Sequence, residues 1–206
     1  MTALVISEHN NEELKSVTLN TVTAAKELDE EIHILVAGKD CSGVAEASSK
    51  IEGVSKVLLV DSDEYEHCLA ENISTLVSKI SGEYNYILAP TTTSGKNFMP
   101  RVAALLDVSQ ISDICAIEGP DTFQRPIYAG NCIATVKTAD EKKVITVRTT
   151  AFDATPAESG SADIVSLEEV HDAGISEFIK EELAQSDRPE LTAADVIISG
   201  GRGTVS

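Results

Sequence analysis

Compact apolar runs alternate with helical segments over residues 3–90, and this alternation limits the possible folds more than any other feature of the sequence. The apolar runs are "ALVIS" (3–7), "IHILVAG" (32–38), "VSKVLLVD" (54–61) and "YNYILAP" (84–90). Between them, segments 19–28, 43–51 and 68–80 carry residues patterned for helices, with the clearest apolar stripe in the last. Such alternation predicts a parallel sheet with right-handed crossovers, and the lack of polar alternation in the strands predicts helices on both faces.

A further helix is expected after the fourth apolar run, in "TTTSGKNFMPRVAALLDV". Thr93 or Ser94 can cap this helix, which should run to about residue 106. Pro100 is expected in or near the first turn, since a deeper position would cost about 3 kcal/mol. The "TTTSGKN" loop can also bind an anion at the helix N-terminus, although capping is the more common use of these residues.

The pattern changes after residue 110. Strand-like segments follow one another with short connections, at 111–119, 122–131, 132–138 and 142–149. We expect "ADEKK" to form the turn between the last two segments, which predicts antiparallel hairpins. The predicted fold class is therefore α/β: a three-layer α/β/α arrangement with a mostly parallel sheet that carries an antiparallel, hairpin-rich extension.

The last quarter of the chain predicts a boundary between two domains. A small and polar loop (149–163) leads to a strand (164–170) and then to a short acidic helix ending near Gln185. A linker follows at 186–189, Thr192 can cap what comes next, and residues 196–198 are expected to form a buried strand before a glycine-rich turn at 199–203. We assign residues 1–185 to an N-terminal α/β domain, and residues 186–206 to a linker plus the first strand and turn of a C-terminal domain.

Charge and cysteine content exclude several classes of function. The formal net charge is -18, from 34 acidic and 16 basic residues, and such a field repels nucleic acids and anionic membrane surfaces. The four cysteines are scattered, which is typical of free thiols in a reduced compartment, and the four histidines have no metal-ligand spacing. The sequence shows neither a secretory signal nor an apolar run that could insert into a membrane, so we predict a cytoplasmic protein.

The familiar catalytic and nucleotide motifs are absent. No G-x-G-x-x-G follows the first strand, and the sequence contains no P-loop and no G-x-S-x-G. Glu8 and His9 follow the first strand and could perform acid–base chemistry, but a polar loop with a hydrogen-bonded histidine is the more common use of such a pair. Arg101 and Arg125 are candidate interface or ion-pair residues, and pairing with carboxylates is the default, given the excess of acidic residues. We predict neither a catalytic residue nor a metal site.

The strongest single signal is "SGGRG" at 199–203. Glycines after a buried strand permit close backbone approach, and their N–H groups can surround an anion. Arg202 is placed to add a charged fork to a phosphate or an electron-rich ring. An ordinary glycine-rich turn explains the same residues equally well.

Taken in order, the stretches "LAPTTTSGKNFMPRVAALLDVSQISDI", "RPIYAGNCIATV" and "RPELTAADVIISGGRG" resemble the electron-transfer flavoprotein family, on the alpha-subunit side, and the resemblance covers nearly the whole chain. It implies an alpha–beta heterodimer with one FAD that carries electrons from acyl-CoA-type flavin dehydrogenases of fatty-acid oxidation to a membrane quinone oxidoreductase. Such a subunit is an electron carrier and not a stand-alone enzyme. The N-terminal domain would be adenine-nucleotide alpha-hydrolase-like yet hold no nucleotide.

The resemblance also implies cofactor contacts, and here the chain departs from the family. By resemblance, Gly201, Arg202 and Gly203 would lie beside FAD, which a C-terminal domain of the full-length protein binds. Family members continue for about another domain, whereas only "TVS" follows here, so we expect a fragment that supplies the scaffold for beta-subunit pairing and binds little or no FAD itself. The alternative is a regulatory α/β module that binds AMP or ATP through Ser94 and Lys96.

Overall fold

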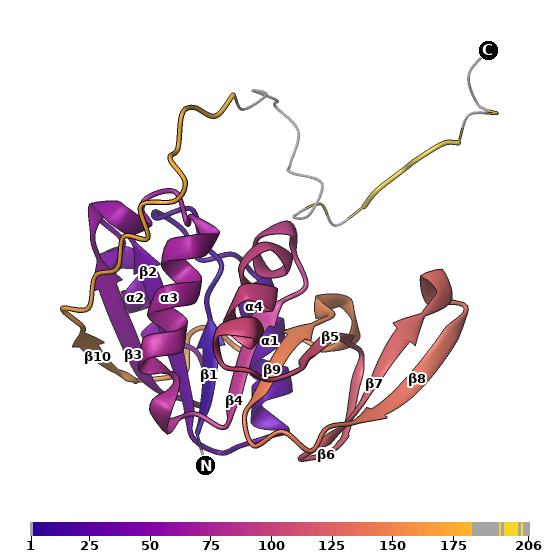
Figure 1. Ribbon diagram of the computed structural model, residues 1–206. Helices are drawn as coiled ribbons and strands as arrows, with labels where there is room; N and C mark the ends of the chain where they lie inside the picture. The colour runs from indigo at the N-terminus through magenta and orange to yellow at the C-terminus, as the bar shows by residue number, and fades with distance from the viewer. Residues whose placement is uncertain (1, 183–193, 195, 202, 204–206) are drawn as a thin grey trace.

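The structure is a computed structural model that describes residues 2–182, 194, 196–201 and 203. Its larger sheet contains β1 (Ala3–Ile6), β2 (Ile32–Gly38), β3 (Val54–Asp61), β4 (Tyr86–Pro90), β5 (Gln110–Ile114), β9 (Lys143–Val147) and β10 (Asp163–Ser166). The strand order is β10-β3-β2-β1-β4-β9-β5, and every neighbouring pair is parallel (Figure 1). The predicted parallel sheet is confirmed.

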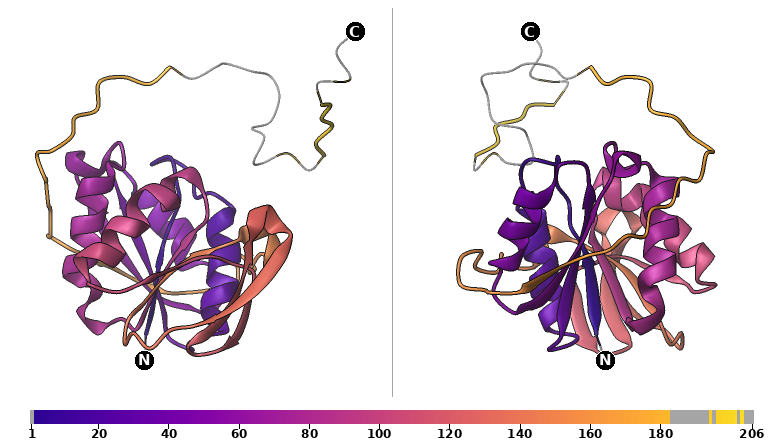
Figure 2. Two further views of the ribbon diagram at one scale, coloured as in Figure 1. Left: turned by 45° about the vertical axis from the view of Figure 1, so that its right-hand side comes forward. Right: turned by 90° about the vertical axis from the view of Figure 1, so that its left-hand side faces the viewer.

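Helices cover both faces of this sheet, as the sequence predicts. They are α1 (Val17–Lys26), α2 (Ser42–Ser49), α3 (Ala70–Ile80) and α4 (Thr93–Leu105), with short 3-10 turns η1 (Asp63–Tyr65), η2 (Ser81–Glu83), η3 (Tyr128–Gly130) and η4 (Thr149–Ala151). Seen edge-on, the sheet separates α1 and α2 from α3 and α4 (Figure 2). No helix in the described part of the chain is long and apolar enough to cross a membrane.

Strand β1 shows why its sequence is apolar throughout. Successive side chains of a strand point to opposite faces, so each face of β1 packs against its own helix layer. Ala3 and Val5 belong to the core beneath α1 and α2, whereas Leu4 and Ile6 belong to the core beneath α3 and α4. All four are buried, which is the pattern of a central strand in a parallel sheet.

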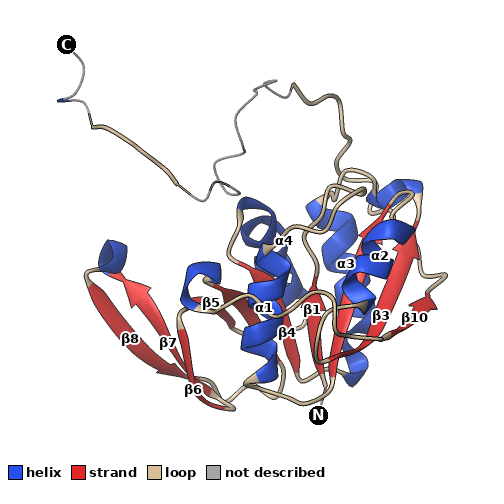
Figure 3. Ribbon diagram, turned by 180° about the vertical axis from the view of Figure 1, so that it is seen from behind, coloured by secondary structure: helices blue, strands red, loops and turns tan. Residues whose placement is uncertain are grey.

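A second, antiparallel sheet extends beyond β5, and we call it the arm (residues 116–137). It consists of β6 (Ala116–Gly119), β7 (Thr122–Ile127) and β8 (Cys132–Lys137) in that order (Figure 3). Phe123 anchors the arm because its side chain is fully buried in the main core. The Tyr86 hydroxyl donates to the Pro120 carbonyl at 3.0 Å and ties β4 to the arm.

The predicted hairpin across "ADEKK" is wrong, although the antiparallel extension itself is present. Strand β8 stays in the arm, while β9 returns to the main sheet and lies between β4 and β5. The expected strand 111–119 is likewise divided into β5 and β6. Asp113, with a φ of 62°, lies at an irregularity within β5, and its carboxylate pairs with the Arg148 guanidinium. The chain passes from the main sheet to the arm at Cys115, whose N–H donates to the Gln124 carbonyl at 2.8 Å.

Pro100 does not lie in the first turn of its helix. Helix α4 begins at Thr93, capped by the Thr92 side chain, which accepts from Gly95 N at 3.2 Å. Pro100 therefore lies well inside the helix, where it donates no bond to the Lys96 carbonyl. Both Lys96 and Pro100 are exposed, so water can hydrate that carbonyl.

Residues 167–178, which we call the strap, cover the end of the predicted strand 164–170 and the start of the predicted acidic helix. The strap follows β10, has no regular secondary structure and passes α3 toward the edge where the parallel strands end (Figure 1). The His171 amide donates to the Tyr65 hydroxyl at 2.9 Å, the Ala173 amide donates to Asn72 Oδ1 at 2.9 Å, and Phe178 stacks on His67. These bonds to other elements hold the strap extended, so the predicted helix is wrong for the described residues 174–182.

Candidate functional site

An open parallel sheet binds ligands where its strand order reverses, at the carboxyl ends of the strands. In this chain β2 and β3 lie on one side of β1, and β4 lies on the other. The reversal therefore falls between β1 and β4, whose ends carry Glu8, His9 and Thr92. The sequence-predicted Glu8–His9 pair and the "TTTSGKN" loop meet at this point.

A hydrogen bond closes the crevice between these two strand ends. Thr92 Oγ1 donates to the Glu8 carboxylate while it accepts from Gly95 N, a combination that a hydroxyl supports. The Glu8 carboxylate thus lies against the N-terminal end of α4, where a phosphate would otherwise be favoured. The turn is also tightly packed, because a Cβ added to Gly95 would lie 2.0 Å from the Pro90 carbonyl oxygen.

His9 is partly buried, and its surroundings favour the neutral ring. Burial lowers its pKa to about 4, and a hydrogen bond with the Ala37 backbone opposes that shift only in part. Its Nδ1 accepts from the backbone N–H of Asn11 at 3.1 Å. The adjacent cavity measures about 20 Å³, which is room for about one water molecule. Glu8 and His9 have separate partners, and a nucleotide base does not fit beside them.

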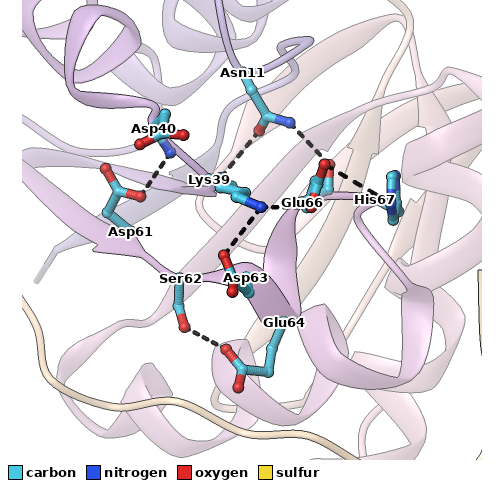
Figure 4. Close-up of polar contacts among 9 residues, drawn as sticks. All are labelled: Asn11, Lys39, Asp40, Asp61, Ser62, Asp63, Glu64, Glu66 and His67. Carbon is cyan, nitrogen blue, oxygen red and sulfur yellow. Dashed lines mark hydrogen bonds and ion pairs between the residues drawn. The ribbon is translucent and has the colours of Figure 1, made fainter.

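Asn11 and Lys39 lie at the carboxyl ends of β2 and β3 (Figure 4). The side-chain Nδ2 of Asn11 donates to the Glu66 carbonyl at 2.8 Å, and its Oδ1 accepts from Lys39 N at 3.3 Å. Lys39 Nζ lies 3.1 Å from Asp63 Oδ1 and 3.0 Å from Glu66 Oε2, so its charge is already paired. The two carboxylates raise the pKa of Lys39.

A carboxylate also lies at the N-terminal end of α2. Asp61 Oδ1 accepts from Asp40 N at 2.7 Å, and Asp61 Oδ2 accepts from Cys41 N at 3.2 Å (Figure 4). These amides precede α2 and are the groups that a bound phosphate would use. Burial, followed by the nearby Asp61 charge, raises the pKa of the Cys41 thiol to about 11, which leaves it protonated and unreactive.

The chain's own side chains thus occupy the sheet edge. Glu8 lies at α4, Asp61 lies at α2, and Asn11 lies between the ends of β2 and β3. Carboxylates stand where a nucleotide would place phosphates, so this edge disfavours anions. No group of three or more potential metal ligands occurs among residues 2–182 and the described tail residues.

The predicted cofactor contacts are not brought into a site. Arg202 lies outside the described residues. Gly201 and Gly203 are exposed, and a Cβ added at either would meet nothing within 4 Å, so these glycines line no cradle. Residues 196–198 are not in a strand, and Val196 is 79% exposed and Ile198 is 95% exposed, so the strand of a C-terminal domain stays a prediction. The roles of Gly201, Arg202 and Gly203 therefore stay predictions.

The two arginines singled out in the sequence differ in their pairing. Arg101 Nη2 lies 2.7 Å from Glu71 Oε1, which confirms the predicted ion pair. Arg125 has no carboxylate partner among the described residues, so the prediction of pairing is wrong for it, and its Nε atom is buried without an acceptor.

Comparisons with known proteins agree on one family. A family model described as "Electron transfer flavoprotein domain" matches residues 3–172. The chain is 59% identical over 98% of its length to the electron transfer flavoprotein subunit alpha of Pseudomonas aeruginosa, and 51% identical over its whole length to that of Bradyrhizobium diazoefficiens. It is 49% identical over 98% of its length to the mitochondrial subunit alpha of Dictyostelium discoideum. The chain spans 66%, 65% and 61% of these relatives, respectively, which is less than two thirds of each.

Proposed function

The chain belongs to the alpha-subunit branch of the electron transfer flavoprotein family, and from that premise we propose that it serves as an electron-carrier subunit rather than as a stand-alone enzyme. In this proposal the complete protein pairs with a beta subunit and carries FAD. It takes electrons from acyl-CoA-type flavin dehydrogenases in the cytoplasm and passes them to a membrane quinone oxidoreductase.

We assign the described α/β domain a structural part in this activity, as the scaffold that pairs with the beta subunit. The observation that supports this most is the Glu8–Thr92 hydrogen bond across the strand-order reversal. It occupies the position where a sheet of this type would bind a ligand of its own. A domain without a ligand site can still contribute through its surface.

We further propose that residues 1–185 form this domain and that residues 186–206 lead into a flavin-binding domain. Gly201, Arg202 and Gly203 would then meet FAD only together with further residues. A single turn supplies a small part of the contacts that hold a dinucleotide. The chain alone should therefore bind little FAD.

The alternative, an AMP- or ATP-binding regulatory module, receives less support. It requires a phosphate beside Ser94 and Lys96, but the Glu8 carboxylate lies at that helix end and Gly95 packs against Pro90. Placing a phosphate there would set two anions side by side.

Mixing the purified chain with its cognate beta subunit tests the proposal. We expect a 1:1 complex by size-exclusion chromatography with light scattering, and no ATP binding by calorimetry. Failure to form the complex, together with ATP binding that is lost in S94A and K96A variants, would favour the regulatory module instead.

A further inference from the structure

Arg125, in strand β7 of the arm, is an unexpected cation. The other arginines in the described range 2–182 are paired: Arg101 with Glu71, and Arg148 with Asp113. With 34 acidic residues against 16 basic ones, an arginine without a carboxylate is unusual here. Arg125 is nevertheless only partly exposed, and its Nε has neither solvent access nor an acceptor. A guanidinium in this state needs a hydrogen-bond or charge partner, and the described residues do not provide one.

Arg125 lines a cavity of about 290 Å³, which we call the Arg125 cavity. The cavity lies where the arm joins the edge strand β5. Its walls include the apolar side chains of Ile111 and Val136, together with Gln110 and Lys137. Gln110 Oε1 is also buried without a partner, while its Nε2 donates to Ser112 Oγ at 3.0 Å. Two polar groups of one cavity wall therefore lack partners.

The nearby carboxylates form no ion pair with Arg125. Asp121 pairs with Lys137 Nζ at 3.1 Å. Asp140 lines the same cavity, where its Oδ2 accepts from Ser109 N at 2.9 Å, but no ion pair joins it to Arg125. A carboxylate is the group that matches a guanidinium in both charge and shape.

The arm indicates where such a carboxylate comes from. The arm extends beyond the edge of the main sheet (Figures 1 and 3). It presents apolar side chains to solvent, with Tyr128 78% exposed at its tip and Ile133 56% exposed on β8. By the strand register, Ile133 lies on the face of the arm opposite to Arg125. An exposed tyrosine and an unpaired arginine on one arm are features of a protein-binding surface, where Tyr and Arg contribute most to affinity.

We propose that the Arg125 cavity receives a carboxylate side chain of the beta subunit, with Tyr128 at the tip of the arm as a further contact. This inference rests on the proposed alpha–beta pairing and names a residue that fixes how the two subunits are positioned relative to each other. Binding would remove the carboxylate from water and place it against a guanidinium that is already held by β7. Losing one partner of such a pair weakens an interface strongly, because the other charge is left buried and unpaired.

Binding of R125M and R125K variants to the beta subunit tests the proposal, with R101M as the matched control. Each Arg→Met change removes one positive charge and keeps a similar stem, but Arg101 already has Glu71 as its partner. We expect R125M to raise the dissociation constant at least about 30-fold, R125K to raise it less, and R101M to leave it within about twofold. Thermal unfolding of each variant checks that it is folded, and R125K provides the test should R125M fail to fold.

The outcomes separate this inference from the proposed function. Binding of the wild-type chain together with unchanged binding by R125M and R125K would overturn the role of the cavity and leave the pairing intact. No binding by the wild-type chain would overturn both. Titration with sodium succinate is the test for a free carboxylate: saturable binding that is lost in R125M, with beta-subunit affinity unchanged, would assign the cavity to a small molecule and contradict the proposal.

Discussion

Replacing Gly95 by alanine should destabilise the chain although it improves helix propensity. Gly95 is the third residue of α4, and a Cβ there would lie 2.0 Å from the Pro90 carbonyl oxygen and 3.3 Å from its carbon. Both are backbone atoms of β4, so helix and strand must separate. Overpacking of this kind costs about 1–3 kcal/mol, whereas Gly→Ala in a helix gains at most about 1 kcal/mol. With a contact this short we expect the upper end of the cost and a net loss of about 2 kcal/mol.

Thermal unfolding followed by circular dichroism measures this effect. A loss of 2 kcal/mol lowers the melting temperature by roughly 4–8 °C in a domain of this size. Gly43→Ala is the matched control, since Gly43 also lies in a first helical turn, in α2, and a Cβ there would meet nothing within 4 Å. It should leave stability unchanged or raise it by up to about 1 kcal/mol. Equal melting temperatures for G95A and G43A would refute the close packing of α4 on β4, and with it the closed phosphate position.

Two further predictions concern buried groups. Because burial lowers the pKa of His9 from 6.5 to about 4, the folded state favours the neutral ring. The resulting contribution to the free energy of unfolding is complete above about pH 6.5 and is lost as the pH falls toward 4. At pH 5 the loss is about 2 kcal/mol. Urea unfolding should therefore show that the free energy of unfolding of H9Q falls by about 2 kcal/mol less than that of the wild type between pH 7 and pH 5. Equal decreases in the two proteins would contradict the lowered pKa of His9. Tyr65→Phe removes the acceptor of the His171 amide and should cost about 1 kcal/mol. Amide exchange at His171 should accelerate in Y65F but not in Y128F, which alters an exposed hydroxyl of the arm; unchanged exchange in Y65F would show that this bond does not hold the strap.

The first half of the fold follows from the sequence because its determinants are local. The predicted strand 54–61 coincides with β3, and the stripe in 68–80 coincides with α3 to within two residues. Each apolar run is bounded by turn residues, and a parallel sheet buries both faces of its central strands. The period of the apolar pattern and the residue composition of each segment are then sufficient to identify each element.

The second half depends on contacts between distant residues, which local pattern does not reveal. Strand β9 lies between β4 and β5, although its nearest neighbour along the chain is β8 in the arm. The strap takes its bonds from Tyr65 and Asn72, which are more than 100 residues away, and a local preference for helix does not override them. Gly174, where the predicted helix would begin, has a φ of 59°, which lies outside the helical region.

The candidate site shows the same division. Sequence analysis placed Glu8 and His9 after the first strand and the "TTTSGKN" loop after the fourth, and the structure brings both to one edge of the sheet. It did not reveal that Thr92 joins Glu8, because that bond connects positions 84 residues apart. It also favoured a carboxylate partner for Arg125 on the basis of composition, whereas no described carboxylate forms an ion pair with it, although Asp140 lines the same cavity.

Calorimetric titration of the purified chain with ATP and with FAD, each without the beta subunit, tests the central claim most directly. The closed sheet edge predicts no saturable binding of either ligand, with dissociation constants weaker than about 1 mM. Saturable 1:1 binding of either one at micromolar concentration would show that these residues form a nucleotide site, and would contradict the scaffold role.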